Sequence, residues 1–239
     1  MSIYYHDQLC LNCLCGSIEN AKEILEVMEG HALIGLLSTA YENEAAAVSA
    51  MLTYQNALNG HISVGLGGGN PAQWQKVAHI AKELKPAHVN QLFTAVGYTR
   101  ALCPNAHINA LVSPSGTCGL VKVSVGPLSQ QAEPALIPIS TAIEMIREMG
   151  GNSLKFFPMQ GLTRRDELMA VAEAAAKADL ILEPTGGITT DNLEEILRML
   201  LNAGVKKIIP HVYTSIMDEH GVTRISEVKK IAEIFKKLL

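Results

Sequence analysis

A lysine in the middle of a short apolar segment is the first candidate for chemistry. Lys155 follows Leu154 and precedes Phe156 and Phe157. A charged amine inside a buried strand is costly unless it is paired, and burial lowers its pKa. Because the neutral amine attacks ketones to give a Schiff base, we predict that Lys155 is a catalytic nucleophile. The alternative is a lysine that reaches past its strand to an ion-pair partner. Phe157 shares the strand face of Lys155, so we expect its ring beside the substrate.

A second polar group, Glu183–Gly187, ends the apolar segment Leu180–Leu182. Because side chains alternate along a strand, Glu183 and Thr185 share one face, with the carboxylate one layer beneath the hydroxyl. Burial should raise the pKa of Glu183, while a cationic imine nearby would lower it. We predict that Glu183 is catalytic, as a proton relay through water or as the counter-ion of Lys155. A structural carboxylate is the alternative. Thr185 is assigned to substrate binding.

The paired glycines that follow are candidates for holding an anion. Gly186 and Gly187 allow backbone N–H groups to approach a charged group closely, and a helix is expected just after them. Barrels of alternating strands and helices often bind phosphate at this position. His211 and Ser215, at the end of the last apolar segment, would supply further donors, so all four residues are assigned to substrate binding. The alternatives are a tight turn at the glycines and a hydrogen-bonded core role for His211.

A glycine-rich run, Gly65–Pro71, follows the third apolar segment. It lacks the third glycine of a dinucleotide-binding fingerprint, because Asn70 stands in that place, and it lacks the Gly-Lys-Ser/Thr of a P-loop. We interpret Gly67 and Gly68 as an anion nest or a close approach to the substrate. A plain turn is the alternative.

Two asparagines, Asn12 and Asn90, lie inside expected buried strands. They are assigned to orienting substrate oxygens, and a bridge across the barrel interior is the alternative. Lys122, in a long excursion, is the rival Schiff-base lysine, although a loop desolvates an amine less reliably than a strand does.

The five cysteines form no recognisable metal motif. Cys10, Cys13 and Cys15 lie close together, whereas Cys103 and Cys118 are isolated. A structural zinc site normally takes four ligands in two close pairs. We therefore expect these thiols to pack as small apolar groups, and we predict no metal site.

Eight apolar segments alternate with eight helical ones. The expected strands are near-continuous apolar runs, as strands of a parallel sheet buried on both faces should be. They are Leu9–Leu14, His31–Leu37, His61–Leu66, Ala87–Phe93, Ile108–Val112, Leu154–Phe157, Leu180–Glu183 and Lys207–Tyr213. The expected helices are Ile18–Met28, Glu42–Leu58, Ala72–Glu83, Gly97–Leu102, Ile139–Met149, Thr163–Lys177, Asp191–Asn202 and Ile225–Leu238. This alternation predicts a single-domain TIM (β/α)8 barrel over residues 1–239, with ligands at the carboxyl ends of its strands.

Composition argues against several classes of partner. Hydrophobic residues make up 48% of the chain and charged residues 18%, which favours a compact, well-filled globule. The net charge of -4 argues against nucleic acid or a membrane surface as partner. The N-terminus lacks a basic region followed by an apolar one, so we expect a cytoplasmic enzyme. The Pro- and Gly-rich excursion between residues 113 and 138 is expected to be a lid or a subunit contact, and we expect a homo-oligomer.

Two motifs taken together resemble a known family. Lys155–Pro158 (Lys-Phe-Phe-Pro) followed by Pro184–Ile188 (Pro-Thr-Gly-Gly-Ile) resembles the 2-keto-3-deoxy-6-phosphogluconate (KDPG) aldolases. The whole chain is similar to the branch linked to bacterial breakdown of D-glucosaminate. The segments that carry this closer likeness are Cys10–Gly16, Ser63–Gly69, His88–Phe93, Leu111–Gly119 and Ile209–Ser215.

The resemblance implies a class I aldolase on a TIM barrel, a lyase without metal or organic cofactor. Lys155 would form the imine, Thr185 would lie near the substrate carboxylate, and Gly186 and Gly187 would begin the substrate and phosphate contacts. The substrate would be KDPG (2-dehydro-3-deoxy-6-phosphogluconate) or a related phosphorylated 2-keto-3-deoxy sugar acid, cleaved to pyruvate and glyceraldehyde 3-phosphate. A metal-dependent class II pyruvate aldolase and a non-catalytic sugar-phosphate binding barrel are the alternatives.

One departure from the family concerns acid–base chemistry. The resemblance implies a catalytic glutamate on the second strand and an arginine four residues later. The corresponding segment, His31–Leu37, contains neither residue. The expected Gly-Gly-Ser on the eighth strand is replaced by His211–Ser215. The proton shuttle must therefore differ from that of the family or use water.

Overall fold

Seven parallel strands form a curved sheet in which the order along the chain is also the order in space. The computed structural model describes residues 2–239. The strands pair in the order β1-β2-β3-β4-β5-β8-β9. Their bounds are β1 Leu11–Cys13, β2 Ala32–Leu37, β3 Ile62–Gly65, β4 His88–Leu92, β5 His107–Pro114, β8 Ser153–Phe156 and β9 Ile181–Pro184. These strands confirm the first seven predicted ones, with small shifts at their ends.

The eighth predicted strand, Lys207–Tyr213, differs from the prediction because it forms only isolated bridges. On one side the N–H of Asn12 donates to Pro210 O (3.0 Å), and the N–H of Val212 donates to Asn12 O (2.9 Å). On the other side the N–H of His211 donates to Pro184 O (3.0 Å). Pro210 has no N–H to donate, which limits the ladder at this point. The segment still joins β9 to β1, so the predicted TIM barrel is confirmed.

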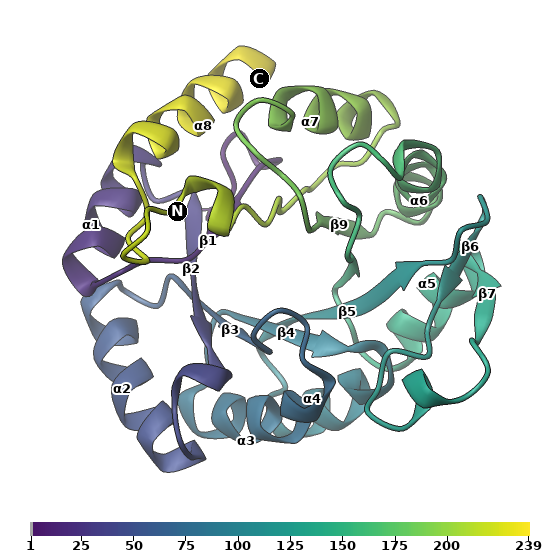
Figure 1. Ribbon diagram of the computed structural model, residues 1–239, viewed down its shortest axis with the longest axis horizontal. Coiled ribbons are helices and arrows are strands. Elements are labelled where there is room, and N and C mark those ends of the chain that lie inside the picture. Colours follow the sequence, from purple (N-terminus) through teal and green to yellow (C-terminus); the bar gives the residue numbers. More distant parts are fainter. Residues whose placement is uncertain (1) are drawn as a thin grey trace.

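Eight helices surround the strands within residues 2–239. Their bounds are α1 Ile18–Val27, α2 Glu44–Ala57, α3 Trp74–Leu84, α4 Val96–Leu102, α5 Ile139–Glu148, α6 Arg165–Ala178, α7 Leu193–Asn202 and α8 Ile225–Leu238. Figure 1 shows them following one another around a ring in chain order, with α8 beside α1. All eight predicted helices are confirmed, and α8 has its predicted first and last residues. Across residues 2–239, no helix combines the length and apolarity that crossing a bilayer requires.

Local sequence explains where these helices begin and which faces they bury. Ser17 accepts the N–H of Asn20 at the start of α1, and Asn43 accepts the N–H of Ala46 at the start of α2. The apolar residues of α8 recur at helical spacing and are buried, whereas its lysines are exposed. The buried residues are Val228, Ile231, Ala232 and Phe235. Each helix therefore packs one apolar face against the outside of the barrel.

Two apolar clusters lie on opposite faces of the sheet. The larger one fills the space between strands and helices. The smaller one, Tyr4, Cys10, Leu33 and Ile209, lies inside the barrel near the amino ends of the strands. Cys10 belongs to the inner cluster and Cys13 to the outer one, so the two thiols point to opposite faces of one strand. The predicted core packing of both cysteines is confirmed, and the two cannot share a ligand.

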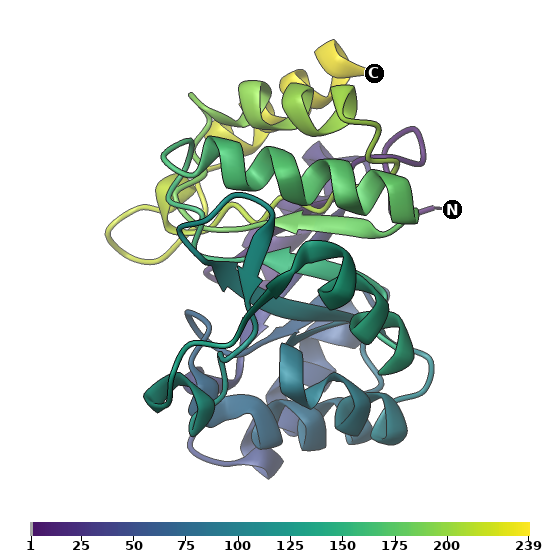
Figure 2. The ribbon, with the colours of Figure 1, turned by 90° about the vertical axis from the view of Figure 1, so that its right-hand side faces the viewer.

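The excursion after β5 forms an antiparallel extension of that strand. β5 pairs with β6 (Leu120–Lys122), which pairs with β7 (Leu136–Pro138). Glu167 of α6 anchors the excursion by accepting the N–H groups of Ser115 (2.8 Å) and Gly116 (2.9 Å). Figure 1 shows the β6–β7 hairpin projecting beyond β5 at the rim of the barrel, and Figure 2 shows it from the side.

Candidate active site

Lys155 lines a small cavity at the carboxyl end of the barrel. The cavity has a volume of about 50 Å³, and its walls include Asn90, Phe157, Thr185, Tyr213 and the glycine-rich loop after β3. That volume holds a few water molecules. The cavity thus leaves room for a small group beside the amine.

Two hydrogen bonds hold the amine of Lys155. Its Nζ lies 2.8 Å from Asn90 Oδ1 and 3.2 Å from His211 Nδ1. Burial lowers the pKa of Lys155 to about 8, although the negative charge of Glu183 acts in the opposite direction. A substantial fraction of the amine is therefore neutral, and so nucleophilic, near neutral pH.

Glu183 lies fully buried in the layer beneath the cavity, and its carboxylate accepts hydrogen bonds from five side chains. Oε1 accepts from His88 Nε2 (3.1 Å), His107 Nε2 (3.2 Å) and Ser153 Oγ. Oε2 accepts from Asn109 Nδ2 (2.6 Å) and His211 Nε2 (2.7 Å). A buried carboxylate is tolerated only when its oxygens are satisfied, and here both oxygens are.

The donors around Glu183 set its charge. Burial acts to raise its pKa, but the charge of His88 and the hydrogen bonds from His107, His211 and His88 hold that pKa well below its usual range. Burial acts in the expected direction, but the imidazole donors outweigh the lost hydration. Burial and the charge of Lys155 lower the pKa of His211 to about 3 against the pull of Glu183. Burial likewise lowers the pKa of His88. The carboxylate is therefore ionised, and burial favours the neutral forms of His88 and His211.

The partners of each ring assign one consistent set of tautomers. His211 donates from Nε2 to Glu183, so its Nδ1 is an acceptor that faces Lys155 Nζ and Tyr213 Oη. His88 donates from Nε2 to Glu183, and its Nδ1 accepts from Ser63 Oγ at 2.8 Å. The carboxylate thus directs the basic nitrogen of His211 toward the amine one layer above.

Part of this cluster also has the spacing of metal ligands. Ligand atoms of His88, His107 and Glu183 all lie within 4.8 Å of one another. The hydrogen bonds account for the same atoms without an ion, because the carboxylate oxygens face ring nitrogens that can donate. The geometry of the cluster therefore favours a fixed anion beneath Lys155.

Comparison of the sequence with known proteins identifies the family of this chain. A model of the KDGP aldolase family matches residues 5–220 of the chain. A curated 2-dehydro-3-deoxy-phosphogluconate aldolase from Salmonella typhimurium (strain 14028s / SGSC 2262) is 42% identical over 99% of this chain and 98% of that protein. The chain belongs to the KDGP aldolase family. The predicted resemblance is confirmed, and the enzyme is a lyase of the aldolase type.

Solved structures share the fold of this aldolase at low sequence identity. Phosphoribosyl anthranilate isomerase from Thermotoga maritima aligns with a TM-score of 0.58 at 10% identity, covering 96% of this chain and 100% of that one. An aldolase named QR15 aligns with a TM-score of 0.53 at 13% identity, covering 97% of this chain and 95% of that one. At these identities the likeness shows the barrel fold alone.

The aldolase brings most of the predicted site residues together. Lys155 and Phe157 line the same cavity, with Asn90, Thr185 and the loop that contains Gly67 and Gly68. The position of an added Cβ on Gly69 lies 2.9 Å from Phe157 Cε1, so the loop passes directly over the phenyl ring.

Asn12 and Lys122 lie outside the walls of this cavity. Asn12 donates to Ser63 Oγ (3.0 Å) and accepts from Tyr213 Oη (3.3 Å), which fits the bridging alternative for this residue. Lys122 is half-buried in the β6–β7 hairpin. Lys155 is therefore the better placed of the two candidate lysines.

The aldolase's second glycine pair, Gly186 and Gly187, lies in the loop after β9. This loop is tied to the closing segment, because Ser215 Oγ donates to Ile188 O at 2.7 Å. An added Cβ on Gly187 would lie 2.5 Å from the backbone nitrogen of Gly161. The loop after β9 therefore passes so close to the loop that contains Gly161 that only glycine fits at position 187. This contact explains the glycine whether or not the site binds an anion.

Several residues of the site were absent from the sequence prediction. They are Ser63, His88, His107, Asn109, Ser153 and Tyr213. The sequence does contain a pattern that could have identified them, because side chains alternate between the two faces of a strand. His88 and Asn90 alternate on β4, His107 and Asn109 alternate on β5, and Ser153 precedes Lys155 by two residues. Polar residues at one level of several buried strands indicate a polar layer inside the barrel.

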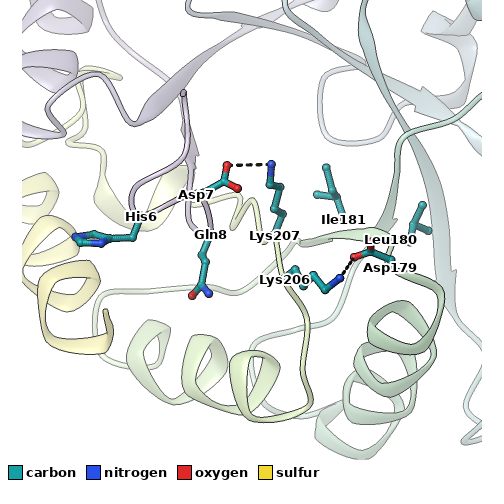
Figure 3. Close-up of a pocket in the computed structure, with 8 residues that line it drawn as sticks. All are labelled: His6, Asp7, Gln8, Asp179, Leu180, Ile181, Lys206 and Lys207. Carbon is teal, nitrogen blue, oxygen red and sulfur yellow. Dashed lines mark ion pairs between the residues drawn. The ribbon is translucent and has the colours of Figure 1, made fainter. Parts of the chain in front are cut away.

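A larger hollow at the opposite end of the barrel does not take part in this site. It has a volume of about 450 Å³ and lies among the amino-end loops around His6–Gln8 and Asp179–Ile181. Figure 3 shows Lys207 paired with Asp7 and Lys206 paired with Asp179, each at 3.0 Å. Its cations are neutralised, and Lys155 is not among its lining residues.

The lowered pKa of His211 predicts acid sensitivity. An unfolded histidine binds a proton below about pH 6.5, whereas folded His211 does so only near pH 3. The free energy of unfolding should therefore fall as pH falls from 6.5, by up to about 1.4 kcal/mol per pH unit for this group. Urea unfolding between pH 7 and 5 should give a shallower pH dependence for His211→Asn. Parallel pH profiles for the two proteins would contradict the assignment.

The loop contact at Gly187 predicts a difference between two glycine substitutions. Gly187 (φ +72°) and Gly68 (φ +58°) both have left-handed backbone, but an added Cβ on Gly68 meets no atom within 4 Å. Both alanine variants carry the strain of positive φ, and Gly187→Ala must also push Gly161 aside. We expect Gly187→Ala to be less stable than Gly68→Ala by roughly 1–3 kcal/mol in urea unfolding. Equal stabilities would show that the loops separate freely.

Proposed function

We propose that this protein is a class I aldolase that cleaves KDPG, or a close relative, to pyruvate and glyceraldehyde 3-phosphate. The observation that carries the proposal is the buried Lys155, whose pKa is lowered to about 8 and which lines a small cavity at the carboxyl end of the barrel. The curated relative named 2-dehydro-3-deoxy-phosphogluconate aldolase supports the choice of substrate, because the two chains align from end to end.

The proposed reaction begins when the neutral amine of Lys155 attacks the C2 ketone of the substrate. Loss of water gives a cationic imine, which is an electron sink. The C3–C4 bond then breaks, its electron pair forms the neutral enamine, and the C4 hydroxyl loses its proton as the aldehyde leaves. Protonation of C3 and hydrolysis of the imine release pyruvate and restore Lys155.

We assign Glu183 the role of a fixed negative charge that acts through His211. Glu183 makes no hydrogen bond to Lys155 within residues 2–239; the imidazole of His211 lies between them. The carboxylate orients His211 and stabilises positive charge on Lys155 or on its imine. Asn90 would position the amine, and Thr185 and Phe157 would contact the keto-acid end of the substrate.

We assign the charged outer end of the substrate to Gly186, Gly187 and the neighbouring Ser215 loop. Among residues 2–239, no hydrogen bond uses the N–H of Gly186 or of Gly187. The guanidinium of Arg224 donates to Ser215 O at 2.9 Å, which brings a positive charge to the same loop. Backbone N–H groups without a partner among these residues and a nearby loop that holds a guanidinium suit a phosphate. Gly67 and Gly68 are the alternative anion site.

The location and assembly of the enzyme remain predictions. A cytoplasmic location and a homo-oligomer are the expectations from the sequence.

Imine formation at Lys155 is the direct test of the proposed function. Incubation with pyruvate and borohydride should add mass to the peptide that contains Lys155, and Lys155→Ala should lose both this labelling and aldol cleavage. Lys122→Ala is the matched control and should retain both. Chelator-sensitive cleavage without trapping would support a class II enzyme instead, with His88, His107 and Glu183 as ligands. Tight ligand binding without pyruvate release would indicate a binding protein.

Glu183→Gln tests the fixed negative charge. The amide keeps the shape but removes the charge that raises the pKa of Lys155, so the acid limb of borohydride trapping should move to lower pH. We expect kcat to fall by about 10²-fold or more, because His211 loses its counter-ion, while trapping at Lys155 survives. Ser153→Ala removes one hydrogen bond to Glu183 without changing the charge, so it should shift neither property appreciably. An unshifted trapping profile in Glu183→Gln would remove Glu183 from the proposal.

A further inference from the structure

Tyr213 is an ionisable group of the cavity that the proposed function leaves without a role. Its side chain lines the cavity with Lys155, and Lys155 Nζ lies 6.0 Å from the centre of its ring. Tyr213 follows His211 by two residues, so both extend into the barrel from the same closing segment. The second strand offers no glutamate for proton transfer, and the phenol occupies the cavity where such a group is needed.

The hydroxyl of Tyr213 and the amine of Lys155 face the same acceptor. His211 Nδ1 lies 2.7 Å from Tyr213 Oη and 3.2 Å from Lys155 Nζ. A neutral ring nitrogen has one lone pair in the ring plane, so it accepts only one of these donors well. The alternative partner of the phenol, Asn12 Oδ1, lies further away, at 3.3 Å.

Once the imine has formed, Tyr213 rather than Lys155 would donate to His211 Nδ1. The cationic imine carries a single hydrogen on the nitrogen of Lys155, and that hydrogen can stay on Asn90 Oδ1, which lies 2.8 Å from Nζ in the free enzyme. His211 Nδ1 is then free to accept from the phenol. The result is a chain of phenol, imidazole and carboxylate through Tyr213, His211 and Glu183, which follows the logic of a nucleophile, base and carboxylate triad.

We propose that Tyr213 takes the proton from the C4 hydroxyl of the substrate and returns a proton to C3, with His211 as its proton partner and Glu183 as the anion behind it. This assignment rests on the proposed function. The imine carbon is bonded to Lys155 Nζ itself, so C3 and C4 are the next atoms along the substrate and lie within the same cavity.

Each proton in this sequence is accounted for. As the C3–C4 bond breaks, the C4 hydroxyl proton passes to Tyr213 Oη, while the phenol proton passes to His211 Nδ1. The bond's electron pair moves into the enamine and neutralises the imine nitrogen. After the aldehyde leaves, His211 returns its proton to Tyr213, and Tyr213 gives its own proton to C3. The pyruvyl imine is again cationic and is hydrolysed, so no other acid, base or oxidant is required.

The charges around His211 support this exchange. The positive charge of Lys155 is one cause of the lowered pKa of His211, second to burial, while Glu183 acts to raise it. When the enamine forms, the nitrogen of Lys155 becomes neutral and that repulsion ends. Burial, Glu183 and Cys13 raise the pKa of Tyr213, which keeps the resting phenol protonated. The site thus allows positive charge to move from the imine to His211 and back.

Exchange of the pyruvate methyl protons with D2O measures proton transfer at C3 separately from cleavage of the C3–C4 bond. Enamine formation from the pyruvyl imine removes a proton from C3 without any aldol cleavage, and proton NMR follows it directly. In Tyr213→Phe we expect exchange and KDPG cleavage to fall together by about 10²-fold or more. Borohydride trapping of pyruvate at Lys155 should survive. Tyr98→Phe removes the hydroxyl of a tyrosine that is 44% exposed and should leave all three readouts unchanged.

The outcomes separate this assignment from the proposed function. If the unaltered enzyme traps no pyruvate, the Schiff-base mechanism itself is wrong. If it traps pyruvate and Tyr213→Phe exchanges protons at the unaltered rate, Tyr213 carries no proton. If Tyr213→Phe loses trapping as well, the hydroxyl positions Lys155 rather than moving protons, and the assignment is overturned.

A second variant keeps the shape of the phenol in case Tyr213→Phe fails to fold. Site-specific 3,5-difluorotyrosine at 213 retains the hydroxyl and lowers its pKa. The groups that face it are His211 and Lys155, with Glu183 behind His211 and Cys13 on β1. The alkaline limb of methyl-proton exchange should move to lower pH, while the pH dependence of trapping stays in place. An unmoved alkaline limb would overturn the role of Tyr213.

Discussion

A buried carboxylate is the constraint on which the interior of this barrel depends. Glu183 is fully enclosed, and an unpaired charge at that depth would destabilise the fold by several kcal/mol. It is retained because β4, β5, β8 and the closing segment each direct a donor at it. A layer that other barrels fill with branched apolar side chains is here a network of imidazoles, amides and hydroxyls.

The network beneath the cavity defines the electrostatics of the layer above it. Its single carboxylate is ionised, and burial favours the neutral forms of His88 and His211, so the layer places a negative charge beneath Lys155. That charge limits how far burial can lower the pKa of the amine. The amine of Lys155 can therefore take either its neutral or its cationic form at pH values close to neutral.

The sequence predicted the barrel and the amine better than it predicted the network. Apolar runs identify the strands, and Lys155 and Glu183 stand out because a charged residue inside such a run is costly. His88, His107 and Ser153 do not stand out, since each is near the start of its run, where polar residues are ordinary. Their meeting point depends on register: His88 pairs with His107, and Asn109 pairs with Ser153. The pKa of Glu183 is lowered because imidazole groups from several strands surround its carboxylate. No single segment of the sequence reveals that these groups meet.

The segment from Ile208 to Val212 joins the last strand to the first by isolated bridges, and it carries His211 toward Lys155. It comes near the end of the chain and rests against residues near the beginning, such as Leu9 and Asn12. During synthesis the first seven strands can pair in order, but the ring stays open until this closing segment has also left the ribosome. The lysine acquires its imidazole partner only at that moment. A chain without this segment therefore holds Lys155 without its contact to His211.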